Sequence, residues 1–137
     1  MKLELFALCD AATETGGKLN LLGAFDAIVA PSAPVVHPSC AVALRLRFQR
    51  IESGPHRIKV AVVDADGRHA VPPFETEIQI GVADTDESSV ANLILNLQQL
   101  RLEKFGRYSV DLAVDGRQEG ALPLFLKPLS NSVRERP

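Results

Sequence analysis

The sequence predicts an all-β protein in which about eight antiparallel strands pack as a sandwich of two sheets. Apolar and polar side chains alternate with a period of two through most of the chain, as they do in strands with one buried face and one wet face. Turn-forming residues separate these alternating segments at short intervals, and no segment shows a convincing helical period. Many short strands with no helix between them are typical of a sandwich.

Eight strands are expected in chain order. They lie at residues 2–9, 18–29, 40–50, 57–64, 74–82, 89–100, 107–115 and 118–127. The third strand alternates most clearly, with Val42, Leu44, Leu46 and Phe48 on one side and with Arg45, Arg47 and Gln49 on the other. The sixth segment has a helix-like content of leucine and glutamine. Its leucines at 93, 95 and 97 nevertheless alternate with polar residues, which favours a strand.

Turn chemistry supports the boundaries between these strands. The turn-forming residues are Gly16, Gly17, Pro31, Pro34, Pro38, Gly54, Pro55, Gly67, Asp115 and Gly116. The last two predict a two-residue hairpin between the final strands, because both residues adopt positive φ at low cost.

Tyr108 favours the immunoglobulin-like kind of sandwich. It begins the seventh strand and precedes the terminal hairpin, which is the position of a tyrosine corner whose hydroxyl bonds to the incoming loop. Val110 stands where an antibody domain carries its second cysteine, so the disulfide-bonded variant is not expected.

One domain is expected over residues 1–127, with a disordered tail over 128–137. The net charge of −2 and the pI near 5.9 argue against general nucleic-acid binding, which needs a basic footprint. No apolar stretch is long enough to span a membrane and no signal peptide is recognised, so a cytoplasmic location is expected.

Four stretches of the chain carry a family resemblance: 6–12, 18–26, 63–68 and 122–126. On these residues the chain resembles a family of short uncharacterised bacterial β-sandwich proteins catalogued as a domain of unknown function. The resemblance covers nearly the whole chain to about residue 127. It implies a stand-alone sandwich and brings no activity, cofactor or catalytic residue with it.

Successive loops of a sandwich alternate between its two ends. The loops near 10–17, 51–56, 83–88 and 115–117 should therefore share one end. We expect Cys9 and Cys40 at opposite ends, as two free thiols. His56 lies at the first end and can pair with a neighbouring carboxylate. The acidic residues of that end suggest a calcium site at Asp84, Asp86 and Glu87, although solvated loop acids explain them as well.

Two surfaces are candidate interfaces. Pairing the third strand with the fourth would set Arg47 opposite Lys59, and with Arg45 these form a basic stripe that Asp111 would balance. The outward register of the other sheet would offer an apolar patch, which marks either self-association or a face covered by Pro-rich or tail segments. The patch residues are Phe6, Leu8, Leu22 and Ile94.

No catalytic motif is recognised, since the chain has neither a nucleophile elbow nor a glycine-rich phosphate loop. We therefore expect a protein without enzymatic activity or cofactor, acting as a protein-interaction or structural module and forming a homodimer. The alternative is a calcium- or small-ligand-binding sandwich that uses the acidic loop end.

Overall fold

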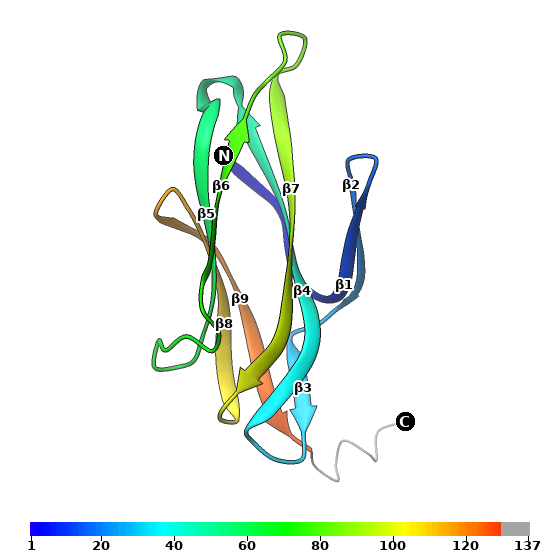
Figure 1. Ribbon diagram of the computed structural model, residues 1–137, viewed down its shortest axis with the longest axis vertical. Helices are drawn as coiled ribbons and strands as arrows, with labels where there is room; N and C mark the ends of the chain where they lie inside the picture. The colour runs from blue at the N-terminus through cyan, green and yellow to red at the C-terminus, as the bar shows by residue number, and fades with distance from the viewer. Residues whose placement is uncertain (130–137) are drawn as a thin grey trace.

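The computed structural model describes residues 1–129, which form nine strands and one short 3-10 helix, with no α-helix among them (Figure 1). The elements are β1 Lys2–Thr15, β2 Lys18–Ala24, β3 Ala27–Ala30, β4 Val35–Gln49, η1 Arg50–Glu52, β5 Gly54–Val63, β6 Phe74–Ile80, β7 Ser88–Leu102, β8 Gly106–Val114 and β9 Arg117–Pro128. Most of the tail expected to be disordered, residues 130–137, lies outside the described residues. The part of the chain that the structure describes holds no helix with the length and apolar character that a membrane crossing requires.

The strands form two sheets. Sheet A has the order β2-β1-β4-β7 and sheet B the order β3-β9-β8-β5-β6. All neighbours are antiparallel except β3 and β9, which run parallel. The all-β fold and its two sheets are as expected, but the strand count is nine rather than eight.

The extra strand arises because the expected strand 18–29 breaks at Phe25 and Asp26. The Phe25 amide donates to the Leu8 carbonyl of sheet A at 3.0 Å. The neighbouring Asp26 carbonyl accepts from the Phe125 amide of sheet B at 2.8 Å. Adjacent residues thus bond to different sheets, and the chain crosses from one to the other at this point.

Strand β1 is longer than expected and pairs with two neighbouring strands. Its first half pairs with β4 as far as Cys9 opposite Ala41, and its second half pairs with β2. Residues 10–24 therefore project as a hairpin, which we call the arm. Its turn, Gly16 and Gly17, adopts positive φ as the turn chemistry requires.

The expected separation of the two cysteines is wrong, because Cys9 lies in the middle of β1 and next to the β4 segment that holds Cys40. Both are nevertheless free and buried, as expected. Cys40 belongs to the core between the sheets, where burial raises the pKa of its thiol to about 11. Cys9 lies on the opposite side of sheet A, and its Sγ is 3.6 Å from the Ala41 carbonyl oxygen.

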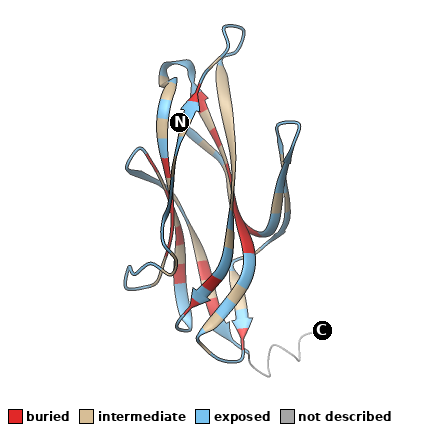
Figure 2. Ribbon diagram, in the orientation of Figure 1, coloured by how far each residue is buried: buried red, intermediate tan, exposed pale blue. Residues whose placement is uncertain are grey.

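The core lies between the sheets and consists of inward residues at alternate positions (Figure 2). The largest fully buried side chains are Phe48, Leu44, Leu46, Ile58, Leu100, Leu102, Leu112, Leu124 and Leu126. The alternation along β7 shifts once, between Leu97 and Leu100, where Gln99 takes a φ of 54°. This local irregularity lets the strand return to the core after two consecutive polar residues.

Successive loops alternate between the ends of the sandwich, as expected (Figure 1). The arm turn, η1, the 81–87 loop and the 115–116 turn share one end. The predicted hairpin is confirmed, with Asp115 and Gly116 at φ values of 53° and 79°. The loops after β3, β5 and β7 share the other end.

Candidate functional site

At the acidic loop end, Arg50 binds the loop that carries the candidate metal ligands. Arg50 Nη2 donates to the carbonyls of Ala83 at 3.2 Å, Asp84 at 3.4 Å and also Asp86. The Arg50 guanidinium therefore already binds the carbonyl oxygens of this loop. Its Nη1 lies 3.8 Å from Asp84 Oδ1. Within residues 1–129, no three His, Cys, Asp or Glu side chains converge as metal ligands. The candidate ligands Asp84, Asp86 and Glu87 are exposed on this loop, and calcium binding there stays a prediction.

The expected partner of His56 is found at the same end. His56 Nδ1 lies 2.6 Å from Asp115 Oδ2, and its Nε2 lies 2.6 Å from the Glu52 carbonyl oxygen. Burial against Phe48 favours the neutral ring, but the bonds to these two acceptors outweigh it and raise the pKa of His56. Protonated His56 donates to both acceptors at once, and it joins η1 to the β8–β9 hairpin.

The predicted basic stripe is divided between the two sheets. The predicted pairing of the third and fourth strands is wrong, because η1 carries the chain from β4 in sheet A to β5 in sheet B. Arg47 lies opposite Lys2 and Val90, whereas Lys59 lies opposite Glu75 and Ala113. Asp111 also belongs to sheet B. It therefore does not balance Arg47.

Glu4 binds both arginines of the stripe. Its Oε2 accepts from Arg47 Nε at 2.7 Å and its Oε1 accepts from Arg45 Nε at 3.0 Å. The hydrogen bonds from Arg47 and then Arg45 outweigh desolvation and lower the pKa of Glu4. The two arginines share one carboxylate, so this pair of side chains keeps one positive charge in excess.

Half of the predicted apolar patch faces the core. Phe6 and Leu8 lie opposite Leu44 and Val42, whose side chains are in the core, and Leu8 is 3% exposed. The expectation that they point outward is wrong. A bulge between Leu3 and Leu5 shifts the alternation of β1, which simple counting along the strand did not take into account.

The arm covers the rest of that face. Asn92 Nδ2 on β7 donates to Glu14 Oε2 at 2.8 Å and to the Gly17 carbonyl at 3.0 Å, so the tip of the arm lies over sheet A. Ile94 is half-buried on the same side, and Leu22 on the arm is 73% exposed. The segment that lies on this face is the chain's own hairpin, while the tail alternative concerns residues 130–137, which lie outside the described residues.

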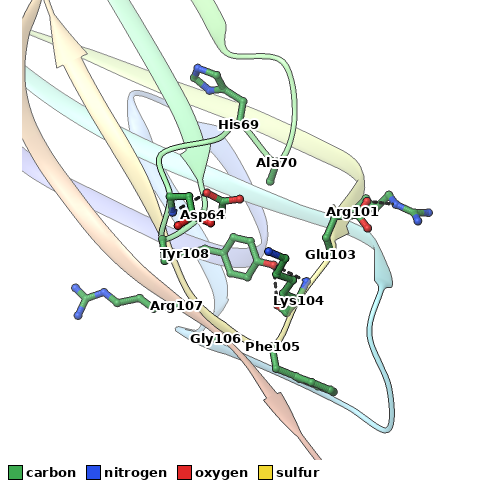
Figure 3. Close-up of a pocket in the computed structure, with 12 residues that line it drawn as sticks. Asp64, His69, Ala70, Arg101, Glu103, Lys104, Phe105, Gly106, Arg107 and Tyr108 are labelled. Carbon is green, nitrogen blue, oxygen red and sulfur yellow. Dashed lines mark hydrogen bonds and ion pairs between the residues drawn. The ribbon is translucent and has the colours of Figure 1, made fainter.

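A cavity of about 190 Å³ opens around Tyr108, at the end of the sandwich opposite the acidic loops (Figure 3). The Tyr108 hydroxyl donates to the Lys104 carbonyl at 2.7 Å and accepts from the Lys104 amide at 3.0 Å, which is the predicted tyrosine corner. Some of the polar groups around the cavity bond to neighbouring groups of the chain. Asp64 Oδ1 accepts from the amides of its own turn, and Arg101 pairs with Glu103 at 2.5 Å. These bonds stabilise the loops around the cavity.

The most distinctive surface is the free edge of β7. It is the last strand of sheet A and pairs with β4 alone, so its other side carries backbone donors and acceptors without a strand partner among the described residues. Its first thirteen residues, 88–100, contain no charge, proline or glycine. A count of charges along each predicted strand would have identified this run. Only the topology shows that it lies at an edge.

Comparisons with known proteins add the family and little else. The model of the "Family of unknown function (DUF6941)" matches residues 4–127. No curated protein matches.

Two of the similar solved structures are much larger proteins. One is the Pseudomonas fluorescens alkylpurine DNA glycosylase AlkC bound to DNA containing an abasic site analog, with 14% identity, a TM-score of 0.48, and coverage of 74% of this chain and 27% of that chain. The other is a glycosyl hydrolase family 2 member from Bacteroides cellulosilyticus, with 13% identity, a TM-score of 0.40, and coverage of 66% and 13%. The chain thus spans well under two thirds of the length of either structure.

Proposed function

The chain belongs to DUF6941, a family of unknown function, and from its surfaces we propose that it is a non-catalytic protein-interaction module that binds partners through the free edge of β7. One observation supports this most strongly: thirteen consecutive edge residues carry no charge, proline or glycine. Folded proteins usually protect an edge with such residues, because unpaired strand backbone recruits other strands. An unprotected edge is suited to strand addition, in which main-chain hydrogen bonds supply the affinity.

The other edges of the sandwich differ from β7. Strand β6 has seven residues and presents exposed Glu75 and Glu77. Strand β3 has four residues, and β2 belongs to the arm. Long side chains of β4 also hold β7 in place: Arg45 Nη1 donates to Asn92 at 3.1 Å and Arg47 Nη1 donates to Ser88 at 2.7 Å. A rigid strand with an open side costs little entropy to pair.

An unrelated strand peptide tests the proposal. The probe is a fluorescent eleven-residue peptide of alternating threonine and valine. It is titrated against the protein, which is first diluted until the protein has the mass of one chain. Wild-type protein and Gln79→Lys on β6 should bind it, whereas Asn96→Lys on β7 should bind about tenfold more weakly, because lysine at an edge opposes strand addition. Both substituted residues are exposed, so both variants should fold. The absence of binding, or equal binding by all three proteins, would overturn the proposal.

We further propose that the sandwich is of the immunoglobulin-like kind. The tyrosine corner supports this, as does the arrangement of β4 and β7 in one sheet with β5, β8 and β9 in the other. Tyr108→Phe removes both bonds to Lys104 and should cost about 1–3 kcal/mol in urea denaturation. An unchanged midpoint would contradict the structural role given to this corner.

A further inference from the structure

We propose that the occupant of the β7 edge is β7 of a second copy of this chain, paired antiparallel around a two-fold axis at Ile94. This inference rests on the proposed function, since it names the partner of the same edge. Two four-stranded A sheets would then join into one continuous sheet.

The neutrality of the run is what self-pairing requires. Around a two-fold axis a central residue meets its own copy, and like charges directly opposite are destabilising. The run 88–100 contains no charge that could meet its own copy. The edge of β6 could not pair in this way without bringing Glu75 and Glu77 close to their copies.

The sequence around Ile94 reads the same in both directions. Residues 92–96 are Asn-Leu-Ile-Leu-Asn. With the axis at Ile94, Asn92 lies opposite Asn96 of the partner copy and Leu93 lies opposite its Leu95. Amide therefore meets amide and leucine meets leucine along the centre of the interface, which is the self-complementarity that a two-fold interface demands.

This register also keeps the two faces of the sheet continuous. Leu93, Leu95 and Leu97 pack toward the core, while Asn92, Ile94 and Asn96 lie on the other face. A two-fold axis that passes through a residue sets the inward-facing positions of one copy opposite the inward-facing positions of the other. An axis between two residues would place leucines of one copy beside asparagines of the other, because successive side chains change sides.

The charges that bound the run favour the antiparallel direction. The first charge before it is Glu87 and the first after it is Arg101. Antiparallel pairing brings Glu87 of one copy to the end where Arg101 of the other lies, at both ends of the interface. Parallel pairing would instead bring each charge to its own copy.

Cysteine crosslinking tests the register. Directly opposed Cα atoms in an antiparallel pair lie about 4.5–5.5 Å apart, which suits a disulfide. Ile94→Cys should therefore form a covalent dimer under mild oxidation, seen on a non-reducing gel. Asn96→Cys is the matched control: its two copies would lie four positions apart, about 13 Å, and should stay uncrosslinked. The native thiols are buried, so wild-type protein should stay uncrosslinked as well.

The mass of the chain in solution gives a second, independent readout. Light scattering at micromolar concentration should give two chains for wild type and for Ile94→Thr, and one chain for Ile94→Lys, which would set two lysines directly opposite each other. A one-chain wild type, or crosslinking of Asn96→Cys as readily as Ile94→Cys, would overturn self-pairing. If the threonine–valine peptide still binds selectively in that case, the edge remains an interaction site and only the identity of the partner is wrong.

Discussion

The two sheets end in edges of opposite character. Strand β6, at the edge of sheet B, is short and carries Glu75 and Glu77, and Lys59 on the neighbouring strand lies 3.8 Å from Glu75. Strand β7, at the edge of sheet A, is fifteen residues long and begins with thirteen uncharged ones. Within residues 1–129, both strands have a strand partner on one side alone. The two edges therefore differ in length and in charge, and the proposed function rests on that difference.

The largest expected effect comes from the core side of β7. Leu100 is fully buried, so Leu100→Ala should cost about 3 kcal/mol, through lost transfer energy and a cavity. Ile78 on β6 is only half-buried, so Ile78→Ala should cost less than half of that free energy. Urea denaturation measures both. Equal losses of unfolding free energy would show that β7 is held no more firmly than β6. That result would contradict the proposal that the β7 edge is a rigid template for strand addition.

Removing the charges of β6 should make the two edges alike. The double variant Glu75→Gln, Glu77→Gln leaves a β6 strand without charge, and its self-association should strengthen about tenfold by sedimentation. The matched control is Asp84→Asn with Asp86→Asn, which removes two acids from the loop between the two edge strands and none from a strand. If both double variants associate equally, net charge rather than edge protection controls assembly.

A smaller effect concerns pH, which acts on sheet B and not on the β7 edge. The raised pKa of His56 contributes stability that is complete below the ordinary value of 6.5 and is lost as pH rises through the raised value. The lowered pKa of Asp115 has the opposite consequence: its contribution is present above 3.8 and is lost as pH falls through the lowered value. The midpoint of thermal unfolding should therefore fall as the pH rises from mildly acidic to alkaline.

The variant His56→Asn should flatten that decline, and His69→Asn, at an exposed loop position, should retain it. Association through residues 88–100 should not change over the same range, since nothing in the run titrates. A decline that persists in His56→Asn would assign the pH dependence to another group.

Calcium should have the smallest effect. Because Arg50 already binds the carbonyls of the 81–87 loop, millimolar calcium should leave the melting midpoint unchanged. An upward shift that Asp84→Asn removes would return the acidic end to consideration as a binding site.

Several local features were predictable because their causes are local. Alternation with a period of two identified the strands, including the sixth, where helix-like composition competed with the leucine pattern. Asp115 and Gly116 predicted their hairpin through cheap positive φ, and Tyr108 predicted its bond to the preceding loop. Pairing of His56 with a carboxylate followed from loops that share one end of the sandwich, although Asp115 itself was not identified.

The candidate surfaces were less predictable, because they depend on which strands become neighbours. Arg47 and Lys59 are twelve positions apart and belong to different sheets, and alternation is identical whichever sheet a strand joins. Phe6 and Leu8 were assigned to the wrong face because one bulged residue reverses every side chain that follows it.

By itself, the sequence determined that this chain is a set of strands, where most of them turn, and that one of them is neutral along thirteen residues. Only the tertiary structure decided that this neutral strand lies at an edge and that the arm covers the outer face beside it. The physical reason is that side-chain alternation is a property of each strand alone, whereas pairing and coverage are choices between segments far apart in the chain.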